Sequence, residues 1–422
     1  MDSLPHRILS FILNYVSVDF CGYGRVCKSF NSIYMAIKEN RINDEKVCFE
    51  QFSPFIVFTS YNRKRIFKKA CQLGDKYVIN YLIEKGVNDW NMAMAFSALG
   101  GHKHLVNFFI EKGAGSDAND WNDGMALAAH GGHKELVEFF IAKGASHWDK
   151  AMDFAAECGH NDIVDFFIAK GANNWNSGMT FAARGGHKNL VDLFISKGAN
   201  NWNEGMIYSA EGGDNNLVDF FVEKGANTWN GGMYSAARGG HKDLVIFFIL
   251  KDASDCDWGM FNSAHYGHKD LVHLFIEKGA NNWNLGIVGA ATNGNKELVE
   301  LFIEKGANNW NKGMIQAARY GHKHLVDFFI EKGANDWNNG MKNAAECGHK
   351  NLVDFFIEKG ANDWNWGMAF AARGGEKNLI DFFIEKGAGS DANDWKRAMD
   401  YAVGGDHKDL VDFFKTKIEP TD

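Results

Sequence analysis

Histidine is the residue whose type and spacing could do chemistry in this sequence, because it recurs regularly and imidazole is a common metal ligand. Nine histidines form the ladder: His102, His133, His160, His187, His241, His268, His322, His349 and His407. One histidine per repeat leaves neighbours about 10 Å apart, the packing distance of two helices, which is too far to share a zinc ion at bonds of about 2 Å. We therefore predict that the histidines hold a turn between helices and bind no metal.

Other reactive side chains form no pattern that indicates catalysis. The seven cysteines include no C-x-x-C pair, so neither a disulfide framework nor a zinc site is implied, and a reducing compartment is favoured. No paired carboxylates, nucleophile–base pattern or phosphate loop rises above chance in so repetitive a sequence. We expect no catalytic residue, no cofactor and no small-molecule ligand.

Tryptophan marks the start of the unit that repeats every 27 residues. The twelve frames begin at Trp90, Trp121, Trp148, Trp175, Trp202, Trp229, Cys256, Trp283, Trp310, Trp337, Trp364 and Trp395, and residues 63–89 form an earlier, less regular unit. Four-residue insertions, Gly115–Ala118 and Gly389–Ala392, precede two frames. A fixed period of this length predicts a solenoid, in which each unit covers the apolar face of its neighbour.

The conserved polar and aromatic positions of the unit also have structural interpretations. Stacked indoles could receive a ligand, but a residue repeated almost identically cannot easily distinguish targets, so we expect each Trp to fill volume between units. The asparagine after the Trp (Asn122, Asn176, Asn203 and Asn230) suits a helix N-cap. Together with the asparagines before each Trp, it could form a hydrogen-bonded ladder.

Each unit is predicted to contain two short helices, here described for the frame of Trp175. Counting that Trp as position 0, the apolar residues Met179, Ala182 and Ala183 share one side of a first helix, which Gly186 ends. The second helix, roughly Lys188 to Lys197, carries Leu190, Val191, Leu193, Phe194 and Ile195. These cover roughly 200° of the helix, so we expect it to be sandwiched between neighbouring units.

The overall composition limits compartment and partners. The 422 residues are 45% hydrophobic with a net charge of −8, which predicts an ordered chain and argues against nucleic acid as a partner. The chain starts without a secretory signal and has no apolar run of 18 residues, so we expect no membrane contact and an intracellular, cytoplasmic protein. The basic run Arg63-Lys64-Arg65 with Lys68-Lys69 is either a nuclear-import signal or the solvated face of a helix.

Residues 1–50 do not fit the repeat, and residues 51–62 connect them to the solenoid of residues 63–422. A helical pattern opens with Leu-Pro and is followed by a Val-Cys-Lys-x-Phe segment; the matching residues are Leu4, Pro5, Ile8, Leu9, Val26, Cys27 and Phe30. This region resembles the F-box, which implies docking of these seven residues on the Skp-type adaptor of a cullin-type ubiquitin ligase. The alternative is a helical cap that shields the end of the solenoid.

The repeated units resemble ankyrin repeats from about residue 63 to residue 414. Ala-Ala-x-x-Gly-His, Leu-Val and Lys-Gly-Ala recur in ankyrin order, but the usual repeat has about 33 residues. The missing residues fall where ankyrin repeats form a β-hairpin, so we expect an all-α solenoid of thirteen shortened units without that hairpin. The combination with an F-box-like module is similar to ankyrin proteins of giant DNA viruses, which implies a host-cell location.

Specificity is expected at positions 2, 5, 6 and 9 of the first helices, which vary between frames and fall on one arc. The resemblance implies that this arc is a concave face that binds a target protein. The predicted target-binding residues are Tyr208, Tyr234, Arg238, Trp258, Phe261, His265, Tyr266, Arg319 and Tyr320. Aromatic residues and Arg dominate interface energies, although such positions can also be unconstrained surface.

These features predict an adaptor that recruits a target to the ubiquitin ligase; the alternative is a scaffold or decoy that sequesters a host protein. The repeat pattern is weakest at Asp252, which replaces a glycine, at Cys256, which replaces a Trp, and at Ile287, which replaces a Met. We expect a change of curvature near residues 250–260.

Overall fold

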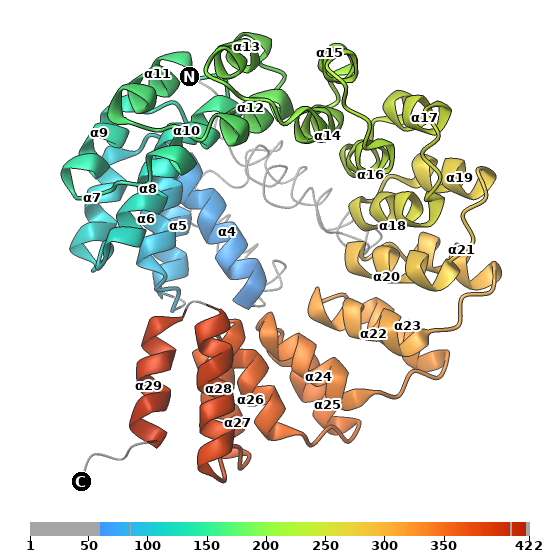
Figure 1. Ribbon diagram of the computed structural model, residues 1–422. Helices are drawn as coiled ribbons and strands as arrows, with labels where there is room; N and C mark the ends of the chain where they lie inside the picture. Colours follow the sequence, from blue (N-terminus) through green and yellow to red (C-terminus); the bar gives the residue numbers. More distant parts are fainter. Residues whose placement is uncertain (1–59, 85, 406, 419–422) are drawn as a thin grey trace, which may run out of the picture. The chain divides into compact units, whose positions relative to one another are not determined.

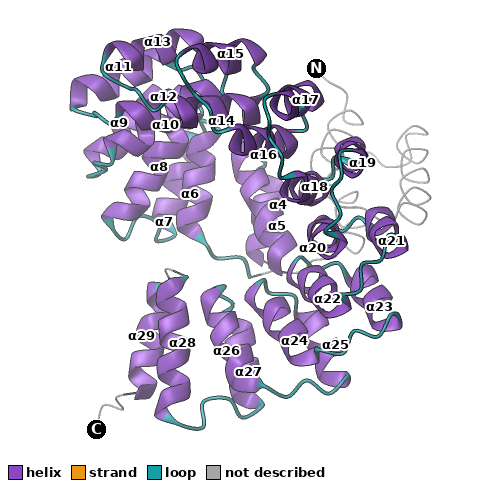
Figure 2. Cartoon of the chain, turned by 45° about the vertical axis from the view of Figure 1, so that its right-hand side comes forward, coloured by secondary structure: helices purple, strands orange, loops and turns teal. Residues whose placement is uncertain are grey.

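The computed structural model describes residues 60–84, 86–405 and 407–418, and its regular structure in these residues is entirely helical (Figure 2). The predicted all-α fold is confirmed, and no β-hairpin stands between the helix pairs of the described residues. None of the helices described is long and apolar enough to cross a membrane.

The chain divides into two compact units, one of Lys64–Asn281 and one that includes Asn282–Asp422. The helices as far as Asn281 are α4 (Ser60–Leu73), α5 (Lys76–Glu84), α6 (Trp90–Leu99), α7 (Lys103–Glu111), α8 (Ala118–His130), α9 (Lys134–Ala142), α10 (Trp148–Glu157), α11 (Asn161–Lys170), α12 (Trp175–Arg184), α13 (Lys188–Ser196), α14 (Trp202–Gly212), α15 (Asn215–Glu223), α16 (Trp229–Gly239), α17 (Lys242–Leu250), α18 (Cys256–Tyr266) and α19 (Lys269–Glu277).

The other unit continues the same pattern of helix pairs. Its helices are α20 (Trp283–Asn293), α21 (Lys296–Glu304), α22 (Trp310–Arg319), α23 (Lys323–Glu331), α24 (Trp337–Glu346), α25 (Lys350–Glu358), α26 (Trp364–Arg373), α27 (Lys377–Glu385), α28 (Ala392–Gly404) and α29 (Lys408–Ile418). In both units the even-numbered helix is the first of its pair. Within each unit, even-numbered helices pack on the next even-numbered helix and on their own odd-numbered partner.

The frame of Trp175 shows why these residues form a stack. Met179, Ala182 and Ala183 of α12 are fully buried, and the small alanines allow the neighbouring even-numbered helices to approach closely. Gly186 ends the first helix with a φ of +76°, a left-handed conformation that glycine adopts without the steric cost of a side chain. The predicted ends of both helices are therefore correct to within a residue or two.

The second helix is buried on one side and half-buried on another. In α13, Leu190, Val191 and Phe194 are buried, whereas Leu193 and Ile195 are half-buried. A cation–π contact joins this second helix to that of the next repeat: the Lys188 ammonium of α13 lies 4.1 Å from the ring centroid of Phe220 in α15. Equivalent lysine–phenylalanine contacts recur from Lys134, Lys296, Lys323, Lys350 and Lys377.

The tryptophans pack inside their own repeat. The ring centroid of Trp175 lies 6.4 Å from that of Phe194, and the Trp side chains at the start of the other frames are half-buried in the same way. Helical Gly178 makes room for this arrangement, because a Cβ there would lie 2.6 Å from the Phe194 ring. These contacts support a packing role for the Trp ladder, but the ring contacts lie within each repeat and not between units as predicted.

The asparagine after each Trp does not cap the helix, so that prediction is wrong. In the frame of Trp175 the cap is the residue before the Trp, because the Asn174 side chain accepts a hydrogen bond from the Ser177 N–H, and in the frame of Trp121 the cap is Asp117. Asn176 already belongs to the first turn, and its Oδ1 reaches the loop that starts α14, where it accepts the N–H groups of Asn200 (2.8 Å) and Asn201 (3.0 Å). The predicted ladder exists, but it joins repeats instead of starting helices.

The histidine ladder also joins repeats. His187 Nε2 lies 3.1 Å from the carbonyl oxygen of Glu157 at the end of the preceding first helix, so the imidazole donates this bond. All nine predicted histidines make the equivalent bond, at 3.0–3.2 Å. Burial lowers the pKa of His349 to about 4, which keeps that ring neutral. The described residues contain no cluster of His, Cys, Asp and Glu suited to a metal ion.

Candidate functional site

The variable positions of the even-numbered helices form the candidate surface. In the unit of Lys64–Asn281, helices α10 to α18 of this series lie on the inner side of an arc and their odd-numbered partners on the outer side (Figure 1). Most side chains at positions 2, 6 and 9 are half-buried or exposed. The surface predicted from the sequence is therefore largely accessible.

Position 5 departs from that prediction in several repeats. Buried residues at this position are Ala95, Ala126, Asp153, Thr180 and Ala369; Gly289 at position 6 and Thr292 at position 9 are also buried. Position 5 lies toward the adjacent even-numbered helix, so small side chains at this position are buried between the two helices. Larger rings at the same position, those of Tyr234 and Phe261, stay half-buried because they extend past it.

Charged residues at position 9 form an alternating ladder along α10 to α16. The Arg184 guanidinium lies 3.4 Å from Glu157 and 3.0 Å from Glu211, and Arg238 lies 3.5 Å from Glu211. Sequence reasoning identified only one of these residues, Arg238, as functional. The signal that could have identified the others is the charge at position 9, which alternates between negative and positive from one frame to the next.

Five of the predicted target-binding residues meet on α16 and α18, and we call them the α18 cluster: Arg238, Trp258, Phe261, His265 and Tyr266. Ring centroids are 5.2 Å apart for Trp258 and Phe261, 5.7 Å for Phe261 and His265, and 4.8 Å for His265 and Tyr266. The Arg238 guanidinium lies 5.5 Å from the Tyr266 ring centroid. Trp258 is 47% exposed and Tyr266 43% exposed. The cluster thus offers large rings to a partner.

The other predicted residues lie outside this cluster. Tyr208 packs on Phe181 in the row of position-6 rings, with centroids 5.9 Å apart. Tyr234 donates its hydroxyl hydrogen to Asp255 over 2.6 Å, so it fixes the start of α18. Arg319 and Tyr320 belong to the unit that contains Asn282–Asp422, where Arg319 forms an ion pair with a glutamate of the next repeat.

A second feature is a hollow of about 440 Å³ across α6, α8 and α10, which sequence reasoning did not find. Its apolar lining includes Phe96, Leu127 and Phe154 at position 6 of three successive repeats. Carboxylates also line it: Asp89, Asp120 and Asp123.

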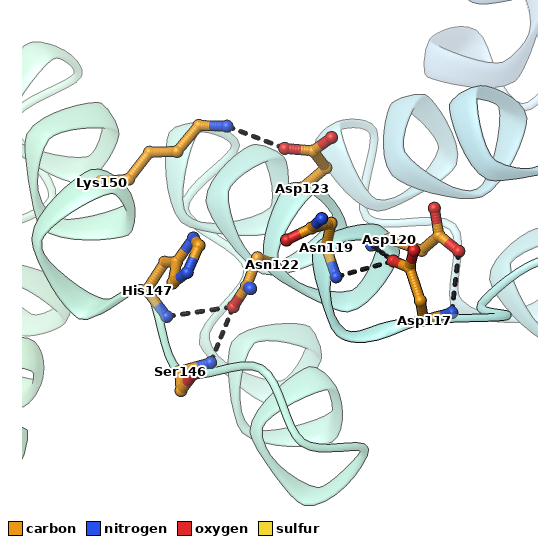
Figure 3. Close-up of polar contacts among 8 residues, drawn as sticks. All are labelled: Asp117, Asn119, Asp120, Asn122, Asp123, Ser146, His147 and Lys150. Atoms are coloured by element: carbon orange, nitrogen blue, oxygen red, sulfur yellow. Dashed lines mark hydrogen bonds and ion pairs between the residues drawn. The ribbon is translucent and has the colours of Figure 1, made fainter. Parts of the chain in front are cut away.

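Figure 3 shows how the polar lining of the hollow is held. Lys150 reaches from α10 to Asp123 on α8, with 2.8 Å between Nζ and Oδ1. Asp120 accepts the N–H of Asp117, which in turn caps α8 (Figure 3). Asp89 and Asp120 therefore belong to helix starts and accept backbone N–H groups, whereas Asp123 is held by the Lys150 side chain.

In the residues that the structure describes, stacked helix pairs define a helical repeat fold. The family model described as ankyrin repeats (3 copies) matches residues 94–178 and 287–365, so these segments are similar to ankyrin repeats, which indicates a protein–protein interaction module. No curated protein matches the chain.

The predicted F-box-like module, residues 1–50, lies outside the described residues, as do all seven of its adaptor-docking residues. The basic run lies in α4, and the structure does not describe the side chains of Arg63, Lys64 and Arg65.

Proposed function

We propose that this chain recruits a target protein to a cullin-type ubiquitin ligase, with its repeats holding the target and residues 1–50 docking on a Skp-type adaptor. The observation that carries the target-binding half is the exposure of Trp258 and Tyr266 at positions where the repeats differ. A soluble stack normally buries such rings, and Trp, Tyr and Arg supply most of the energy at protein interfaces.

The target-binding half is tested with the double variant Trp258→Ala/Tyr266→Ala. Tagged wild-type and variant chains are incubated with lysate, and captured proteins are quantified by mass spectrometry. A matched control, Ile246→Ala/Leu250→Ala, removes exposed apolar side chains from α17 instead. We expect at least tenfold loss of the captured target in the α18 variant and no loss in the control. Equal capture by all three chains would refute this half.

The adaptor half is supported by the Leu-Pro and Val-Cys-Lys-x-Phe segments of residues 1–50. Its test is co-purification of the Skp-type adaptor with the native chain, compared with Leu4→Asp/Pro5→Ala. We expect stoichiometric binding by the native chain and loss in the variant. A native chain that binds no adaptor ends the ligase proposal.

Deletion of residues 1–50 distinguishes the adaptor hypothesis from the alternative, a scaffold or decoy in which this region is only a cap. A docking module can be removed and leave a soluble stack. Removal of a cap would expose apolar surface and cause aggregation. We expect the shortened chain to elute in size-exclusion chromatography as a soluble species with the oligomeric state of the full chain, and to retain target binding.

A further inference from the structure

The hollow across α6, α8 and α10 combines two features that a binding site for a cationic side chain needs. Its volume, about 440 Å³, lies within the range of about 300–1,000 Å³ typical of binding sites. Its lining places Phe96, Leu127 and Phe154 beside three carboxylates and the ammonium group of Lys150. Apolar surface beside excess negative charge fits the aliphatic stem and charged head of Lys or Arg.

One of the two phenyl rings already meets a cation of the chain itself, and the other is held in place by its neighbours. The Lys68 ammonium already lies 5.4 Å from the ring centroid of Phe96. The ring of Phe154 is held between His130 and Phe181, with centroids 5.6 Å and 6.2 Å away. An aromatic ring held in this way needs no rearrangement to receive a positive charge.

In the other unit, Lys and Arg side chains of the chain itself lie over aromatic rings, as we expect a partner's side chain to do in the hollow. There Phe370, at the same position 6, lies 5.8 Å from the ammonium of Lys342. The neighbouring ring of Trp366 has the Arg397 guanidinium 4.8 Å from its centroid. In that unit the chain's own Lys342 and Arg397 thus lie over Phe370 and over Trp366, which is at position 2.

Two of the three carboxylates, Asp89 and Asp123, can accept a new partner at low cost. Asp89 is exposed, and the Asp123 and Lys150 side chains are 61% and 51% exposed, so their ion pair contributes little to stability. A cation from outside can therefore replace Lys150 at Asp123. Lys150 acts as a competitor for the site.

We infer that this hollow binds a basic segment of a partner protein, with one Lys or Arg side chain lying along Phe96, Leu127 and Phe154 and its charge at Asp89, Asp120 and Asp123. The inference rests on the proposed protein-binding function and specifies the chemistry of a second contact, away from the α18 cluster.

The test uses the full chain and a fluorescein-labelled nine-residue peptide that carries two arginines separated by a leucine, with anisotropy as the readout. Two variants change the site in opposite directions. Asp89→Asn/Asp123→Asn removes two charges, and asparagine can still cap α6. Lys150→Met removes the competitor and keeps an unbranched apolar side chain. Asp165→Asn, an exposed change on α11, is the matched control.

We expect the double variant to weaken peptide binding at least fivefold, Lys150→Met to tighten it about threefold and Asp165→Asn to leave it unchanged. A peptide with norleucine in place of arginine should not bind. Equal affinity of all four chains, or no binding of the arginine peptide to any of them, would overturn the inference. Neither result affects protein capture by the α18 cluster, so this test can fail without refuting the proposed function, and the reverse also holds.

Discussion

The carboxyl group of Asp153 makes the stability of the stack depend on pH. It lies at position 5 of α10, with 9% of the residue exposed, and its Oδ2 accepts the Ser177 hydroxyl over 2.5 Å. Its Oδ1 is buried without a hydrogen-bond partner among the described residues. Burial, together with the nearby charge of Asp149 and against the effect of the Ser177 bond, raises its pKa to about 7.

The sign of the effect follows from comparing the folded and unfolded chains. In the unfolded chain the pKa of Asp is about 4, so the folded state holds the proton more tightly, and stability falls as the pH rises from about 4 to about 7. With a pKa of about 7 for Asp153 in the folded state, the free energy of unfolding should fall by at most about 3 kcal/mol between pH 5 and pH 8. The loss should be complete just above pH 7.

The variant Asp153→Asn removes this charge and keeps an oxygen that can accept the Ser177 hydroxyl. We expect it to be more stable than the wild type at pH 8, with the difference shrinking toward pH 5. Urea unfolding followed by circular dichroism at pH 5, 6, 7 and 8 measures this, with exposed Asp165→Asn as the control. Parallel stability curves for wild type and Asp153→Asn would show that the carboxyl is not destabilised by burial.

Three further changes test the repeat contacts, each by urea unfolding. Asp252→Gly should stabilise the chain by about 0.5–1 kcal/mol, because Asp252 has a φ of +69° that favours glycine; an unchanged midpoint would contradict this. Asn176→Ala should cost about 1 kcal/mol, since the N–H groups of Asn200 and Asn201 at the start of α14 lose their acceptor, whereas a merely solvated Asn176 would cost almost nothing. His187→Ala should cost about 1–2 kcal/mol by releasing the Glu157 carbonyl, and His187→Gln should recover part of it if that bond matters.

Apolar spacing and helix-ending glycines predicted the helix pairs well, because each pair is specified by residues within its own repeat. The apolar spacing of Met179, Ala182 and Ala183 fixes a helix face, and Gly186 fixes its end. Asp252 shows the limit of reasoning from residue type: it replaces a glycine but keeps the left-handed conformation, so the chain turns there as in other repeats. The predicted change of curvature near residues 250–260 stays a prediction.

Contacts between repeats were harder to predict, because sequence neighbours do not show what lies across the boundary. Asn176 was assigned to a cap on its position beside a Trp, yet its oxygen reaches residues 24 and 25 positions later. The hollow was missed for the same reason. Phe96, Leu127 and Phe154 come from three frames, and only the stacking of α6, α8 and α10 places them together.

The frame of Cys256 explains how a repeat can gain a binding residue. Other frames keep their Trp at position 0, half-buried against a phenylalanine such as Phe194. This frame has Cys256 there and places Trp258 two residues later, where the ring is 47% exposed and contacts Phe261. The repeat gives up a contact that stabilises the stack, while its Met260 stays fully buried. A Trp moved from a packing position to an exposed one, in a helix whose core is retained, favours a role in binding over random drift.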